Sequence, residues 1–168
     1  MTRDPVRKAC EACFQTYKSD GTEFARAVAR EFDVHLPGVA DEIVDNLRSG
    51  PHWIALPNGI AAAQSAKEGK LVIGGLKGSE KAHPDPHGHV VVVVAGPLAH
   101  DAYPSAYWGG HGETGARNKT TNWAWRTEDR DQVSYAAYHG QPDPFGIQSD
   151  PCGIQSDPCG VQSEPSAR

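Results

Sequence analysis

The chain has 168 residues, a mass of 18.0 kDa and a formal net charge of −5 at pH 7. This length suits one domain with at most a tail, and 38% hydrophobic residues with 18 glycines and 13 prolines predict a folded core joined by many loops. An acidic chain lacks the basic surface that holds a phosphate backbone, so we expect no nucleic-acid partner.

The sequence contains no run of about 18 apolar residues, the length of a membrane span, so we expect no membrane insertion. The N-terminal sequence MTRDPVRKACEACF lacks the apolar region of a signal peptide, and we expect any export to use another route. The cysteines are too few and too scattered for a disulfide-dense scaffold. Cys10 or Cys13 could pair with Cys152 or Cys159, and the spacing leaves this pairing open.

Helical patterns fill the N-terminal part of the chain. Asp4 and Pro5 are typical of an N-cap and a first turn, and apolar residues then recur at helical spacing to about Lys18. A second helix is predicted to begin beside Gly21, after a polar break. A third, shorter helix is predicted over residues 41–47.

From residue 71 onward the pattern becomes that of strands. The runs LVIGGL, HVVVVVA, TNWAWR and VSYAAYH are rich in β-branched and aromatic residues. The five valines have no polar alternation, which predicts a central strand covered on both faces. Helices followed by strands predict an α+β domain in which the N-terminal helices pack on a mostly antiparallel sheet.

After about Gly140 the composition changes to the repeats DPFGIQS, DPCGIQS and DPCGVQS. A proline in every repeat excludes a coiled coil. We therefore predict a domain over residues 1–140 and a Pro/Gly-rich heptapeptide-repeat tail over 141–168 that is extended or disordered. The tail is either an adaptor or a short duplication without a role of its own.

The densest cluster of reactive side chains lies in HPDPHGHVVVVV. Alternate residues of an extended segment point the same way, so a zinc site is one alternative, with ligands from His83, Asp85, His87 and His89, completed by His111 and Glu113. The other alternative uses His89 alone, as the general base of a nucleophilic hydrolase. The simplest interpretation of His83 to His87 is a solvated loop, and we expect no metal or other cofactor.

His89 stands apart because it lies at the start of the valine strand. A buried polar ring must be hydrogen-bonded or functional, since burying it unpaired is costly. In papain-type folds such a histidine faces a nucleophile at the start of a helix, where the helix dipole lowers the pKa of a thiol. The helix start at Gly21 has no cysteine, and Cys10 and Cys13 are expected to be structural.

The segments FARAVAREFDV, LVIGGLKG, GHVVVVVAGPL, YPSAYWGG and WRTEDRDQVSYAAY, in this order, closely resemble the type VI secretion amidase effectors of bacteria. These enzymes cut the bond between glutamate and diaminopimelate in peptidoglycan. The resemblance covers about Val6 to Tyr138. It implies an NlpC-type papain-like fold, a Cys–His pair, a peptidoglycan peptide as substrate, an immunity protein as partner, and action in the periplasm of the target cell, reached without a signal peptide. We also expect a monomer.

The resemblance also implies the positions of site residues. The family's histidine, in a Gly-His-Val-x-Val-Val context, falls on His89, and alignment on Phe24 places the nucleophilic cysteine at Gly21. The residues expected to line the substrate groove are Asp20, Thr22, Tyr107 and Trp108. Trp123 and Trp125 could also line a glycopeptide groove, but aromatic residues on strands usually pack in the core, so we favour the core for them. Residues 126–131 are expected in a solvated turn.

A glycine has no side chain to attack a carbonyl, so acylation at Gly21 is impossible. Thr22 is a poor substitute, because a threonine at a helix start usually acts as a cap. The sequence therefore predicts an amidase with little or no activity. The alternatives are a non-catalytic module that binds peptidoglycan or an immunity protein, and a metal-dependent hydrolase that uses His83, His87 and His89.

Overall fold

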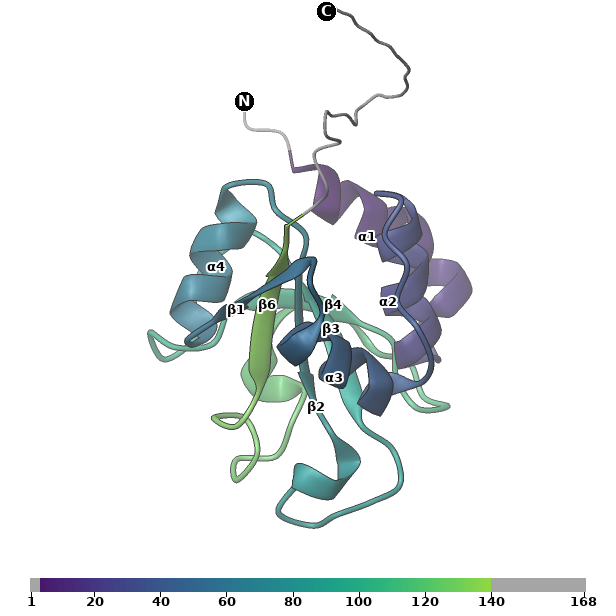
Figure 1. The fold of residues 1–168 in the computed structure, drawn as a ribbon, viewed down its shortest axis with the longest axis vertical. Helices are drawn as coiled ribbons and strands as arrows, with labels where there is room; N and C mark the ends of the chain where they lie inside the picture. Colours follow the sequence, from purple (N-terminus) through teal and green to yellow (C-terminus); the bar gives the residue numbers. More distant parts are fainter. Residues whose placement is uncertain (1–3, 140–168) are drawn as a thin grey trace, which may run out of the picture. The chain divides into compact units, whose positions relative to one another are not determined.

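The computed structural model describes residues 4–139, and the predicted tail lies outside them. Four α-helices and six β-strands make up this part of the chain (Figure 1). The helices are α1 (Pro5–Tyr17), α2 (Gly21–Arg30), α3 (Ala40–Ser49) and α4 (Gly59–Lys67). The strands are β1 (Trp53–Leu56), β2 (Val72–Leu76), β3 (His89–Val93), β4 (Ser105–Trp108), β5 (Ala116–Thr120) and β6 (Ser134–Tyr138).

The strands form one sheet in the order β1-β6-β2-β3-β4-β5. Every pair of neighbouring strands is antiparallel. β3 lies inside the sheet between β2 and β4, and all five of its residues are buried. The predicted α+β class with an antiparallel sheet is confirmed, and so is the central, doubly covered valine strand.

The valine strand divides the core into two layers, because alternate side chains of a strand point to opposite faces. Val90 and Val92 pack in the layer that contains residues of α1, α2 and α3. Val91 and Val93 pack in the layer that contains residues of α4. In Figure 1, α1 and α2 lie together to one side of the strands and α4 lies to the other.

Aspartate caps start the first two helices where the sequence predicts them. The Asp4 carboxylate accepts a hydrogen bond from the Arg7 N–H at 2.9 Å, and Pro5 fills the first turn, where a missing N–H costs nothing. The Asp20 carboxylate accepts from the Glu23 N–H at 3.1 Å. Asp20 therefore has a structural role that fixes Gly21 as the first residue of α2.

Five features of the fold differ from the sequence prediction. β1, β4 and α4 were not predicted, because the two strands have only four residues each and α4 is a short alanine-rich helix with a weak apolar stripe. β5 was missed because it is an edge strand whose residues are mostly exposed and polar. The run TNWAWR is not a strand: residues Thr121–Trp123 form a 3-10 turn that takes the chain away from the end of β5.

Cys10 and Cys13 lie buried on α1, and both are free thiols in the part of the chain that the structure describes. Burial raises the pKa of the Cys10 thiol well above its usual value. Both therefore serve as small apolar core residues, while Cys152 and Cys159 lie outside the described residues. Among residues 4–139, no helix has the length and apolar character needed to cross a membrane.

The core predicts a contrast between two isoleucines in strands. Ile73 in β2 is fully buried, whereas the side chain of Ile54 in β1 is 50% exposed. We expect Ile73→Ala to lower the free energy of unfolding by about 2–5 kcal/mol, because it leaves a cavity in the core layer that contains residues of α1, α2 and α3. Ile54→Ala should cost less than about 1 kcal/mol. Urea unfolding of the two variants checks this, and equal losses would contradict the assigned sheet faces.

Candidate active site

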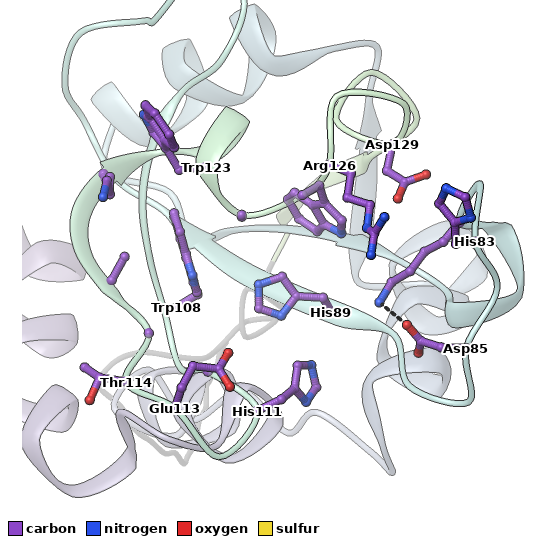
Figure 2. A pocket seen from close by; sticks show the side chains of 17 residues that line it. His83, Asp85, His89, Trp108, His111, Glu113, Thr114, Trp123, Arg126 and Asp129 are labelled. Carbon is purple, nitrogen blue, oxygen red and sulfur yellow. Dashed lines mark hydrogen bonds and ion pairs between the residues drawn. The ribbon is translucent and has the colours of Figure 1, made fainter.

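A cavity of about 400 Å³ lies beside His89. Figure 2 shows His89 near its centre, with side chains from several loops around it. The walls come from the loop before β3, which contributes His83 and Asp85, from β3 and the end of β4, from the segment that follows β4, from β5 and from the turns that follow Thr120. A second hollow of about 360 Å³ has His111 in common with the first and includes Asp20, Thr22, Asp41 and His87.

His89 is the first residue of β3 and is only 7% exposed. Its ring packs against two indoles, at 5.2 Å from the ring of Trp125 and 6.3 Å from that of Trp108, and lies 5.6 Å from the ring of His111. Its Nδ1 atom is buried and has no hydrogen-bond partner among the described residues. Burial, and then the nearby charges of His111 and Lys81, lower the pKa of His89 from 6.5 to about 3.

Gly21 faces this unpaired nitrogen from the N-terminus of α2. A Cβ atom at position 21 would lie 3.5 Å from His89 Nδ1 and 3.0 Å from the carbonyl oxygen of Gly109. The φ angle of Gly21 is not among the positive values in the described chain, so its backbone does not require glycine. A side chain at position 21 would therefore project toward the imidazole after a small shift of the Gly109 carbonyl.

A glycine-rich segment after β4 holds His111 next to His89. Gly110, Gly112 and Gly115 donate backbone hydrogen bonds of 2.7–3.0 Å to the carbonyl oxygens of Lys18 and Ser19, in the turn between α1 and α2. The Gly21 N–H donates in turn to the Gly110 carbonyl at 2.9 Å. A Cβ at Gly109 would lie 2.6 Å from the backbone carbonyl oxygen of Asp20, so only glycine permits this close approach of the two backbones.

The structure does not support the zinc alternative. Within residues 4–139, no three His, Cys, Asp or Glu side chains are placed to hold one metal ion. The segment that carries His83, Asp85 and His87 is an irregular loop, not an extended strand, so alternate residues do not share one side. Asp85 pairs with Lys81 at 3.0 Å, and His87 lines the second hollow instead of the His89 cavity.

The predicted groove residues separate into three groups. Trp108 lines the His89 cavity, as expected. Tyr107 does not: it is 1% exposed, packs in the core layer that contains residues of α1, α2 and α3, and donates its hydroxyl hydrogen to Glu11. Neighbouring residues of a strand point to opposite faces, so Tyr107 and Trp108 cannot both face the cavity. Asp20 and Thr22 line the second hollow.

Several cavity residues were missed because they lie on irregular loops. Trp125 is 8% exposed and packs in the core layer that contains residues of α4, as expected, and it also lines the cavity. Trp123, also expected in the core, is instead 67% exposed on the cavity wall. The expected solvated turn also contributes Asp129, which is buried and accepts a hydrogen bond from the Ala82 N–H at 2.7 Å. For the segment that carries His111, the sequence did contain a signal: the Gly109-Gly110 pair, which is typical of two backbones in close contact.

Comparison with known proteins adds evidence that geometry alone does not give. The chain is 38% identical over 125 residues to the peptidoglycan amidase Tse1 of Pseudomonas aeruginosa, covering 72% of this chain and 76% of the relative. The chain belongs to this peptidoglycan amidase family. No general protein-family model matches the sequence. The resemblance to peptidoglycan amidases seen in the sequence is thus confirmed at the level of the family.

The buried imidazole of this amidase-family chain makes a prediction about pH. With a folded pKa near 3 and a usual value of 6.5, His89 binds a proton only after unfolding in the intervening range. Stability should therefore fall as the pH drops from about 6.5 toward 3, because the unfolded state binds more protons there. His89→Gln removes this contribution, so unfolding experiments should show a shallower loss for the variant over this range.

Nuclear magnetic resonance of the histidine side chains gives a direct check. The His89 ring signals, assigned by their absence in His89→Gln, should keep their neutral positions from pH 8 down to about pH 4. A titration of His89 near pH 6.5 would contradict the buried, unpaired environment described above.

Proposed function

We propose that this member of the peptidoglycan amidase family binds peptidoglycan stem peptides in the His89 cavity and does not hydrolyse them. The observation that carries the proposal is the direction of position 21, whose Cβ would lie 3.5 Å from His89 Nδ1. In a cysteine amidase this is the place of the nucleophile, and here Gly21 leaves it vacant. His89 is then the retained general base, and the cavity is the retained substrate groove.

The absence of a nucleophile follows from the chemistry of the described residues. Cys10 and Cys13 are core residues of α1 and do not line the cavity. Thr22 lines the other hollow. Thr114 is the hydroxyl side chain on the cavity wall, and it makes no hydrogen bond to His89 in the described structure. An alcohol without a base at hydrogen-bond distance is a poor nucleophile.

Direct attack by water is also disfavoured. A general base works best when its pKa lies near the working pH, whereas burial lowers the pKa of His89 to about 3. An imidazole this weak takes little of the proton from an attacking water. The site therefore keeps the means to bind a peptide but lacks an efficient route to cleave it.

The finer features of the proposal rest on the family relationship. We assign an NlpC-type papain-like fold, supported by a helix N-terminus that faces the first residue of an interior antiparallel strand. We further assign the glutamate-to-diaminopimelate linkage as the bound region, an immunity protein as a protein partner, and the periplasm of a target bacterium as the place of action. The chain's similarity to the peptidoglycan amidase Tse1 supports these assignments.

The test compares the wild type with Gly21→Cys and Gly21→Ala on purified peptidoglycan, with mass analysis of the released muropeptides. We expect all three proteins to sediment with peptidoglycan and only Gly21→Cys to release products. Gly21→Ala is the matched control, because it adds the same Cβ beside Gly109 without adding a thiol. A chelator should not change any of the results.

Two outcomes would contradict the proposal. Hydrolysis by the wild type would show that another group supplies the nucleophile. Loss of that activity with a chelator would support the alternative of a metal-dependent hydrolase. Failure of the wild type to bind peptidoglycan or its soluble muropeptides would remove the peptide-binding function.

A further inference from the structure

We propose that the His89 cavity contains a subsite for a free carboxylate of the bound peptide, formed by the indole N–H of Trp125 and the guanidinium of Arg126. Both side chains line the cavity. This inference rests on the proposed function and extends it, because it names the chemical group that the cavity selects.

Trp125 supplies an unused hydrogen-bond donor. Its side chain is 8% exposed, and its Nε1 atom is buried without a partner among the described residues. A buried donor of this kind destabilises the fold unless a ligand or water satisfies it. An indole N–H only donates, so the missing partner must be an acceptor. The centre of the Trp125 ring lies 5.2 Å from that of the His89 ring, so the two side chains are neighbours in the cavity wall.

Arg126 supplies an unused positive charge. Its side chain is exposed on the cavity wall, and its guanidinium makes no ion pair or hydrogen bond with residues 4–139. The other cations of the cavity are engaged: Lys81 pairs with Asp85 at 3.0 Å, and the Lys119 ammonium lies 5.2 Å from the centre of the Trp123 ring. The planar fork of a guanidinium matches the two oxygens of a carboxylate.

The positions of the acidic side chains in the cavity are compatible with a bound anion beside Arg126. Glu113 lies near His111, on the opposite side of His89 from Arg126 (Figure 2). Asp129 is on the side of Arg126 but is buried, and its carboxylate accepts the Ala82 N–H. No ion pair joins Asp129 to Arg126 in the described structure. A ligand carboxylate is therefore attracted toward Arg126 and repelled from Glu113.

The subsite predicts selectivity between two chemical forms of one peptide. A stem peptide with a free carboxylate next to the bound amide gives both an acceptor for Trp125 and a charge for Arg126. The same peptide with that carboxylate amidated keeps an acceptor oxygen but loses the charge. Hydrogen bonds to charged groups contribute more than neutral ones, so the free acid should bind about tenfold more tightly than the amide.

Titration calorimetry of soluble muropeptides tests this, using one muropeptide with free carboxylates and the same muropeptide amidated. Wild type should prefer the acid by about tenfold. Arg126→Gln should abolish the preference by weakening binding of the acid alone, and Trp125→Phe should weaken binding of the acid severalfold. Lys119→Gln is the matched control, since it removes a cation from the same cavity and should leave the preference intact. Thermal unfolding confirms that each variant folds.

The outcomes separate this inference from the proposed function. Equal binding of acid and amide by the wild type would overturn the carboxylate subsite and leave peptide binding in place. An equal loss in Lys119→Gln and Arg126→Gln would also overturn it, because diffuse electrostatic attraction would then explain the preference. If the wild type binds neither muropeptide, the proposed function fails and the subsite fails with it.

Discussion

The geometry of the candidate site depends on the close approach between the N-terminus of α2 and the first residue of β3. α2 is fixed in place by its buried face, where Phe24 and Val28 belong to the same core layer as Val90 and Val92 of β3. Glycine-mediated hydrogen bonds from the segment after β4 then lock the turn that precedes α2. Because the backbone is held from both sides, position 21 and His89 face each other whatever side chain position 21 carries.

Under the proposed function, that constraint explains how the architecture of an active site can be retained without a nucleophile. Replacing a cysteine by glycine removes a small side chain from the site but leaves the cap at Asp20, the core contacts of α2 and the walls of the cavity unchanged. The electrostatics do change. A thiolate beside His89 would stabilise an imidazolium, whereas the neighbouring charges of His111 and Lys81 add to the effect of burial and keep the ring neutral.

The parts of the fold that the sequence predicted are those with strong periodic signals. The capped helices α1 and α2 and the valine strand were predicted because caps and uninterrupted apolar runs are local features. β5 was missed because an edge strand needs no apolar pattern, and its exposed ARNKT sequence resembles a loop. Tyr107 was misassigned because the residues before it gave no register, and a shift of one residue reverses the face of a strand.

The site shows the same division between local and long-range information. His89 could be singled out because a polar ring at the start of a buried strand is anomalous in the sequence itself. Arg126 and Asp129 could not be, because irregular turns bring them to the cavity and no periodic pattern encodes such turns. For Trp125 the sequence left both the core and the groove open. Only the assembled structure shows that the indole of Trp125 and the imidazole of His89 are neighbours with unused polar atoms.

The most direct test of the facing positions is the reactivity of the thiol introduced by Gly21→Cys. Its rate of alkylation would be followed against pH by mass spectrometry of the peptide that contains position 21, which separates it from the other cysteines. The account predicts a thiol pKa at least one unit below the usual value of about 8.5, with most of that decrease lost when His89→Gln is added. Identical pH profiles with and without His89 would contradict the account.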